Sequence, residues 1–454
     1  MAQTGNRSPA AKLGLLDATM VGIGAMIGAG IFVLTGLAAE TAGAGAVVVF
    51  ALNGGVTTLT ALSYAELASA IPKSGGGYAY VYEAFSDPVS FVMGWTRWFT
   101  YASAGALYAL GFASNFIELV HLYWAGLPAS PAWELGYALG AVGTFVALNA
   151  LSTEASGGAE TIVTLVKIAI LGVFIAFGIG AVNAGEFELL FPAEGGVWTA
   201  LPAMGLTFIA FQGYDLVATV TEEVENPRQN IPRAIFLSLF VTVVIYLLVV
   251  GIAVGTLGPE RLGAAGETAV AEAAAGFMPD IGLFGASLGA ALIAFGAVFS
   301  TISALNAVII GSSRVAFSMG REDQLPGRLG DLHPRYGTPF VAILSSAAVM
   351  LVATAFAPVQ VVGNLASLFS LIGFIVVNLA VIKLRRDQPG LARPFEVPLY
   401  PVPPILGCVL NLALALYIPL QTWIIAGAWL AVGGMVYLAL NPAMLRGSRA
   451  SGSP

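Results

Sequence analysis

Long apolar runs of helical length follow one another along most of the chain, separated by short polar segments. About twelve of these runs are long enough to cross a bilayer, which takes about 20 residues of α-helix. Because they lack the short alternating pattern of a membrane β-barrel, they predict an all-α, polytopic membrane protein. The predicted spans are 13–38, 44–70, 87–119, 133–151, 160–183, 197–221, 233–256, 281–311, 339–357, 361–383, 398–418 and 421–441.

The first predicted span is unusual because it is rich in glycine. Four glycines occupy nine positions between Gly22 and Gly30, inside an uncharged stretch from 18 to 39. Gly costs about 1 kcal/mol relative to Ala in a helix interior, so we expect this helix to open at Gly28-Ala29-Gly30. An opened helix presents free N–H groups at the start of its second half, where an anion binds readily. The alternative is that these glycines only allow helices to pack closely.

The sixth predicted span is interrupted as well, near Gln212-Gly213. Asp215 follows, and Asp is a favoured N-cap, so we expect it to begin the second half of this span. Gln212 would face a substrate or satisfy the opened backbone. The two interrupted spans are five spans apart and therefore cross the membrane in opposite directions. Paired interrupted segments in two halves of a chain indicate a transport site at the bilayer midplane.

Lys167 lies well inside the fifth span. A lysine at the centre of a spanning helix costs about 2.5–3.5 kcal/mol on insertion scales, so it should face a partner or a wet cavity. Burial disfavours the charged form of an amine, which would let Lys167 exchange a proton. The alternative is a lysine that reaches for the interface or makes a structural pair.

Hydroxyl groups cluster in the apolar eighth span at Ser300, Thr301 and Ser303. They could hydrogen-bond Lys167 or ligate a cation. The alternative is a hydrogen bond from each hydroxyl to the preceding turn of its own helix, which is common for Ser and Thr in membranes.

Composition supports a membrane protein and narrows its chemistry. Of the 454 residues, 58% are hydrophobic and 9% charged, against about 25% charged in soluble domains. The single Cys408 excludes an internal disulfide, and the two histidines fall in loops. We therefore expect no metal site, no cofactor and no nucleic-acid partner. No span pairs acidic and basic groups as an enzyme would, so we expect no enzymatic activity.

The basic residues predict the orientation. Nearly all of the 18 lysines and arginines fall in segments on the side of the N-terminus, and basic loops face the cytoplasm. The chain should therefore cross the plasma membrane many times with both termini cytoplasmic. We expect a cytoplasmic tail at 1–12, a membrane transport domain at 13–441, and a disordered cytoplasmic tail at 442–454. The longest polar connector, 311–338, would lie on the same side.

Three motifs resemble those of the amino acid–polyamine–organocation (APC) superfamily of transporters. They are residues 26–36, residues 72–78, and residues 211–215 running into 222–235. The chain is most similar to the cationic amino acid transporter branch and its prokaryotic proton-coupled relatives, over essentially its whole length. The resemblance implies a LeuT-type inverted repeat of five plus five helices. Its two repeats would be about 13–183 and 197–383, with two extra helices at about 398–441.

The resemblance also implies roles for individual residues. The substrate carboxylate would meet the backbone N–H groups of Ala29 and Gly30, with Ile27 lining the opening. The α-amino group would bind backbone carbonyls around Ile209, Ala210 and Gln212. This places the substrate beside both breaks, at Gly28 in the first span and at Gly213 in the sixth. Lys167 matches the lysine that replaces sodium in proton-coupled relatives, beside an eighth-span hydroxyl from Ser300, Thr301 or Ser303.

One departure bears on the substrate. Many members of the cationic branch carry Glu where this chain has Thr100, and Arg97 lies nearby. The loss of that anion favours neutral or varied amino acids over arginine and lysine. The sequence predicts a secondary active transporter that works by alternating access in the lipid bilayer, as a proton-coupled amino acid symporter. The alternatives are an amino acid or polyamine exchanger, a channel, and an amino acid sensor that does not transport.

Overall fold

The computed structural model describes residues 13–73, 75–85, 87–151, 157–279 and 288–441. Most of these residues are helical, and within them the extended backbone pairs only in one isolated bridge between Leu13 and Val224. The predicted all-α, polytopic fold is confirmed. The tails predicted at 1–12 and 442–454 lie outside the described residues.

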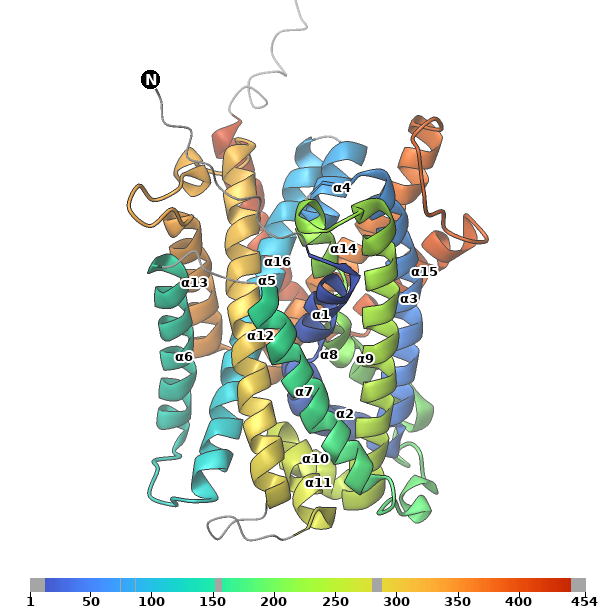
Figure 1. The fold of residues 1–454 in the computed structure, drawn as a ribbon, viewed down its shortest axis with the longest axis vertical. Helices are drawn as coiled ribbons and strands as arrows, with labels where there is room; N and C mark the ends of the chain where they lie inside the picture. The colour runs from blue at the N-terminus through green and yellow to red at the C-terminus, as the bar shows by residue number, and fades with distance from the viewer. Residues whose placement is uncertain (1–12, 74, 86, 152–156, 280–287, 442–454) are drawn as a thin grey trace, which may run out of the picture.

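Ten long helices form the body of the molecule and lie roughly along its long axis (Figure 1). They are α3 (Ala46–Ala70), α5 (Asp87–His121), α6 (Pro131–Leu151), α7 (Gly157–Gly178), α9 (Pro227–Leu257), α12 (Leu288–Arg321), α13 (Phe340–Phe356), α14 (Val359–Asp387), α15 (Val402–Leu416) and α16 (Leu420–Leu440). By length and hydropathy, nine helical stretches of the described chain qualify as spans, and one of them, Leu15–Ala70, covers the first two predicted runs. The shorter apolar helices α13 and α15 match two further predicted runs.

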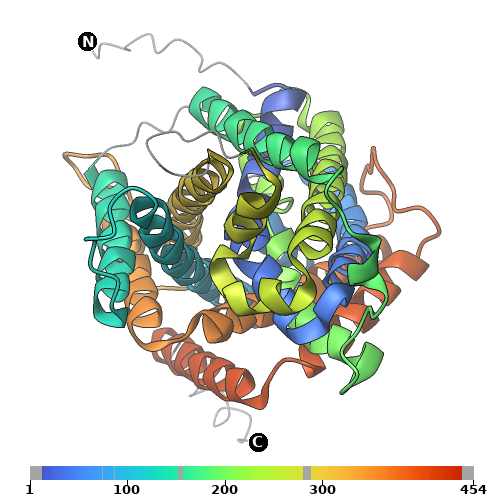
Figure 2. The ribbon, with the colours of Figure 1, turned by 90° about the horizontal axis from the view of Figure 1, so that it is seen from below.

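The first and sixth predicted spans are each divided into shorter helices. The first consists of α1 (Leu15–Met26) and α2 (Ala29–Ala42). The sixth consists of α8 (Ala200–Thr207) and two 3-10 helices, η4 (Phe208–Phe211) and η5 (Leu216–Glu223). Figures 1 and 2 show α1, α2 and α8 inside the bundle, surrounded by the continuous helices.

Three short helices occupy segments that the sequence pattern assigns to loops. The helix α4 (Gly76–Ala84) follows α3, whereas α10 (Pro259–Ala265) and α11 (Ala269–Phe277) follow α9. The helix α12 also continues ten residues beyond the predicted boundary at 311, because its last turns bury Ala316 and Met319 against aromatic side chains of α5. The connector predicted at 311–338 is correspondingly shorter.

The two ends of the bundle are named here by their short helices. The α4 end is uppermost in Figure 1. The α10 end contains α10 and α11, and Figure 2 views the molecule from that end, with these two helices lying across the middle of the bundle.

Candidate functional site

The break in the first span lies at Ile27 and Gly28. The amide of Ile27 closes the last turn of α1 on Ile23 (2.7 Å), and the amide of Gly28 bonds the carbonyl of Met26 (2.7 Å). The amides at the start of α2 have no acceptor within their own helix. A Cβ on Gly28 would lie 2.7 Å from the Cβ of Ala304 on α12, so the opened backbone faces that helix.

The break in the sixth span is possible because of Gly213, whose φ is +144°. L-residues with side chains rarely adopt this conformation. A Cβ at this position would lie 2.7 Å from the backbone nitrogen of Met26, and a Cβ on Gly30 would lie 2.8 Å from the Cα of Ala210. Glycine therefore lets the two interrupted spans meet backbone to backbone at their breaks.

Side chains from neighbouring helices satisfy the backbone that the breaks expose. The hydroxyl of Tyr246 on α9 lies 2.5 Å from the carbonyl of Met26 and 3.0 Å from that of Ala210. Ser367 on α14 accepts from the amide of Ile209 (3.1 Å), and the carbonyl of Ile209 accepts from the amide of Gln212 (3.0 Å). The carbonyls of Ile209 and Ala210 thus already have one partner each, and each oxygen has a second lone pair.

Lys167 is buried, with 1% of its surface exposed, and its Nζ donates to the carbonyl of Gly24 on α1 (2.9 Å). The same face of α7 contacts α1 twice more. Thr164 bonds the carbonyl of Met20 (3.3 Å) and Thr161 bonds the carboxylate of Asp17 (3.2 Å). A spacing of three residues places these side chains on one helix face, so α7 holds the whole length of α1.

Ser300 on α12 approaches the first break from the other side. Its hydroxyl donates to the carbonyl of Ile27 (2.7 Å). The hydroxyls of Thr301 and Ser303 instead bond carbonyls of their own helix, at 2.7 Å and 3.1 Å. Of the three predicted hydroxyls, the structure brings only Ser300 to the break.

Asp215 occupies the N-cap position of η5, but its side chain makes no capping hydrogen bond. The capping role predicted for this side chain is therefore wrong. One oxygen accepts from the amide of Gly213 (3.0 Å), and the other forms an ion pair with Nη2 of Arg97 on α5. The charge of the guanidinium competes for this oxygen more strongly than a helix amide does.

Arg97 and Asp215 form a buried latch on the α4 side of the breaks. Their exposed fractions are 3% and 1%, and Nη2 of Arg97 also donates to the hydroxyl of Tyr64 on α3 (2.7 Å). The latch thereby joins α3, α5 and the interrupted sixth span. The sequence marks Arg97 only as a neighbour of Thr100. The two partners are 118 residues apart and carry no local signal of their pairing.

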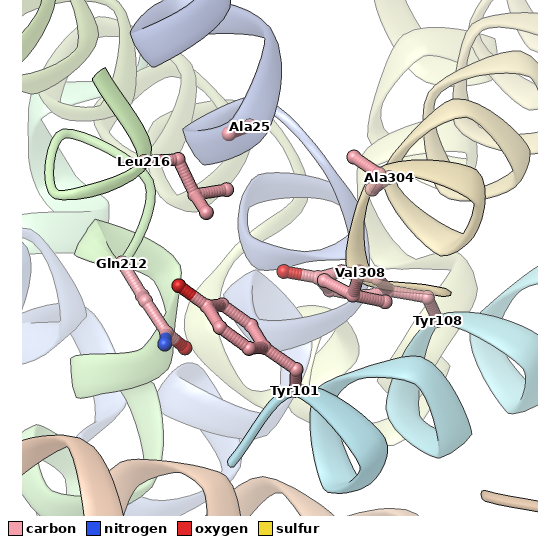
Figure 3. Close-up of a pocket in the computed structure, with 8 residues that line it drawn as sticks. Ala25, Tyr101, Tyr108, Gln212, Leu216, Ala304 and Val308 are labelled. Carbon is pink, nitrogen blue, oxygen red and sulfur yellow. The ribbon is translucent and has the colours of Figure 1, made fainter. Parts of the chain in front are cut away.

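A small cavity lies next to both breaks (Figure 3). Its volume is only about 10 Å³, so the site is nearly closed in this structure. Gln212 is the one predicted site residue among its walls, which also include Tyr108, a residue that sequence reasoning missed. The lining residues are Ala25, Tyr101, Tyr108, Gln212, Leu216, Ala304, Ala307 and Val308.

At the α10 end, one hydroxyl connects two carboxylates. Ser114 on α5 lies 2.7 Å from an oxygen of Glu134 on α6 and 2.6 Å from an oxygen of Glu267, between α10 and α11. Burial raises the pKa of Glu267, the hydrogen bond from Ser114 opposes this shift, and the charge of Glu134 adds to it. The backbone next to Glu267 packs closely on α2, since a Cβ on Gly36 would lie 1.9 Å from the carbonyl of Gly266.

The chain is similar to known transporters over nearly its whole length. The family model described as amino acid permease matches residues 13–437. The chain is 31% identical to the methylthioribose transporter of Bacillus subtilis and 31% identical to its branched-chain amino acid permease BcaP. Each alignment covers 96% of this chain and 94% of the relative. It is also 30% identical to the serine/threonine exchanger SteT of the same organism, over 87% of this chain and 88% of the relative. The chain therefore belongs to the amino acid permease family, which consists of membrane transporters and not of enzymes.

Proposed function

We propose that this protein is a proton-coupled amino acid symporter that works by alternating access, with Lys167 as the protonatable group. The observation that carries the proposal is the contact between the Lys167 amine and the carbonyl of Gly24, four residues before the break at Gly28. A buried amine beside an interrupted helix can gain and lose a proton, and each change alters its attraction for that carbonyl.

The two breaks are suited to an amino acid zwitterion. The carboxylate would take the N–H groups of Ala29 and Gly30 at the start of α2, with Ile27 at the opening, because a helix N-terminus attracts anions. The α-amino group would share the carbonyls of Ile209, Ala210 and Gln212. Since the first two of these already accept one protein hydrogen bond, the substrate would use their second lone pairs.

The proton would couple to movement through α1. A charged Lys167 holds Gly24, and Ser300 holds Ile27, so α1 is attached to α7 and α12 on both sides. A neutral amine loses the charge-assisted part of that attraction, which frees α1 to tilt. In this mechanism Ser300 has a direct role, whereas Thr301 and Ser303 stabilise α12 itself.

Orientation and architecture complete the proposal. The protein lies in the plasma membrane with its α4 end on the cytoplasmic side, because the basic segments lie at that end. The helices α1 to α7 and α8 to α14 form two inverted repeats of the LeuT type, followed by α15 and α16. The two interrupted segments are five spans apart, as an inverted repeat requires.

Exchange is the second candidate, favoured by the similarity to a serine/threonine exchanger at 30% identity. An exchanger would need substrate on both sides and would ignore a proton gradient. The other named relatives carry a branched-chain amino acid and methylthioribose. Neutral solutes are therefore the first substrates to test.

The test uses purified full-length protein in liposomes. Counterflow with each of the twenty amino acids identifies a substrate, whatever the coupling. An inward proton gradient should then drive its accumulation, and Lys167→Met should reduce this accumulation at least tenfold. Lys383→Met is the matched control, because Lys383 is 40% exposed and forms a surface ion pair with Asp387. Accumulation that requires sodium, or that survives in Lys167→Met, would contradict the proposal, and uptake that depends only on internal substrate would favour exchange.

A further inference from the structure

The cavity beside the two breaks carries polar groups that the protein leaves without partners. Gln212 is 5% exposed, and its Nε2 has no hydrogen-bond partner among the described residues. Tyr101 and Tyr108 are 3% and 4% exposed, and their hydroxyls also make no hydrogen bond within the described chain. Figure 3 shows these three side chains converging on the same space, two from α5 and one from the break of the sixth span.

The remaining walls are apolar. Ala25 comes from α1, and Ala304 and Val308 come from α12. None of the eight lining residues carries a charge. Arg97, whose guanidinium lies over the ring of Tyr101, and Asp215 neutralise each other in their ion pair. A charged substrate side chain would lack a counter-ion here, and an unpaired charge is expensive in a buried site.

A substrate with hydrogen-bonding groups would supply partners for the polar side chains that line the cavity. An unsatisfied buried donor loses its hydration without compensation. The amide nitrogen of Gln212 is such a donor, and the hydroxyls of Tyr101 and Tyr108 line the same small space. A site built to hydrogen-bond a hydroxyl strongly rejects an analogue of the same shape that lacks it, because its own polar groups are then left unpaired.

We propose that this cavity selects neutral substrates whose short side chain carries a hydroxyl or amide, and that Tyr101, Tyr108 and Gln212 make this selection. The proposal rests on the transport function proposed above and specifies its substrate class. Threonine is the expected type of substrate, and valine, which has nearly the same shape but no side-chain hydroxyl, is the expected poor one.

The test compares threonine with valine in liposomes that contain the purified protein. Initial rates of counterflow give kcat/KM for each amino acid, and the wild-type ratio should favour threonine at least tenfold. Tyr101→Phe, Tyr108→Phe and Gln212→Leu each remove one hydrogen-bonding group and should lower this ratio at least threefold, mainly through threonine. Asparagine against leucine gives the same comparison for an amide.

Ser103→Ala is the matched control. Ser103 is a buried residue of the same helix, α5, and its hydroxyl also lacks a partner among the described residues, but it does not line the cavity. Its loss should leave the ratio unchanged. A wild-type ratio of one or below overturns the inference, even if a variant fails to fold, while transport itself still stands. Absence of flux for all twenty amino acids would instead overturn the proposed function.

Discussion

The two ends of the bundle are closed by different chemistry. At the α4 end, Arg97 and Asp215 form a buried ion pair with Tyr64 as a third partner. At the α10 end, Glu134 and Glu267 share the hydroxyl of Ser114. At the α4 end α5 is bonded to the interrupted sixth span itself, and at the α10 end it is bonded to a segment that packs on α2. Both contacts hold α5 against the interrupted spans.

The difference lies in what each contact needs in order to persist. The guanidinium of Arg97 stays charged at any physiological pH, so the latch at the α4 end depends on geometry alone. A serine hydroxyl has one hydrogen and can donate to only one carboxylate at a time. The second short contact at the α10 end therefore needs a proton on one of the two carboxyl groups. One end is held by fixed charges and the other by a proton.

The largest expected effect comes from breaking the fixed-charge latch. Arg97→Met leaves Asp215 charged, buried and unpaired, which costs about 3–5 kcal/mol. We expect a matching loss in the free energy of unfolding in mixed micelles, together with loss of transport. Arg261→Met is the control, since Arg261 and its partner Glu272 are 71% and 44% exposed, and such a pair contributes about 0–1 kcal/mol.

A double variant sharpens the same point. Arg97→Met combined with Asp215→Leu removes both charges and should recover most of the stability lost in Arg97→Met. Recovery of stability without recovery of transport would assign the latch a role in the transport cycle. If Arg97→Met proved as stable as the Arg261→Met control, the latch would not hold the α4 end.

A smaller effect is expected from Gly213→Ala. The positive φ of Gly213 strains any other residue, at a cost of about 1–3 kcal/mol, and its new Cβ would collide with the backbone of Met26. Because the amide of Gly213 also holds Asp215, the α4 latch should loosen. Unfolding in mixed micelles measures the loss. Gly251→Ala on α9 is the control, since a Cβ there meets no atom within 4 Å; equal losses in the two variants would contradict this account.

The smallest effect is a pH dependence confined to the α10 end. Burial raises the pKa of Glu267 when this end is closed, so the closed form binds more protons than an open one. Its extra stability is fully present below the ordinary carboxyl pKa and is lost as pH rises through the raised pKa. Besides Ser114, the groups that face Glu267 are Glu134 on α6 and Asn115 on α5, which donates to its backbone carbonyl (3.2 Å).

Hydrogen exchange of residues 259–277, corrected for its intrinsic pH dependence, measures this closure. Protection should fall from pH 5 to pH 8 in the wild-type protein. It should stay constant in Glu267→Gln, which keeps a neutral side chain at every pH. Protection that rises with pH, or a pH dependence that remains in Glu267→Gln, would contradict the claim that a proton on Glu267 stabilises the closed α10 end.

Local composition predicted the spans and the place of both interruptions. A long apolar run must be a helix in a bilayer, and glycines within it mark where the helix opens, as Gly28 and Gly213 do. Lys167 was recognisable because a lysine in such a run is costly. These signals are all contained within one helix.

Contacts between helices were not predictable from a single sequence. The pairing of Arg97 with Asp215 depends on how α5 packs on the sixth span, and the local N-cap pattern suggested a different role for Asp215. Tyr108 looks like an ordinary aromatic of a spanning helix until α12 presents Ala304 opposite it. The helices α10 and α11 are short and polar in part, so hydropathy could not separate them from a loop.

The measurement that tests the central claim most directly follows protons and substrate together. Liposomes with an entrapped pH-sensitive dye contain the purified protein, and the amino acid identified by counterflow is added outside. We predict acidification of the lumen as the substrate enters, without sodium, and its loss in Lys167→Met but not in Lys383→Met. Entry of substrate without acidification, or equal acidification in Lys167→Met, would contradict the account.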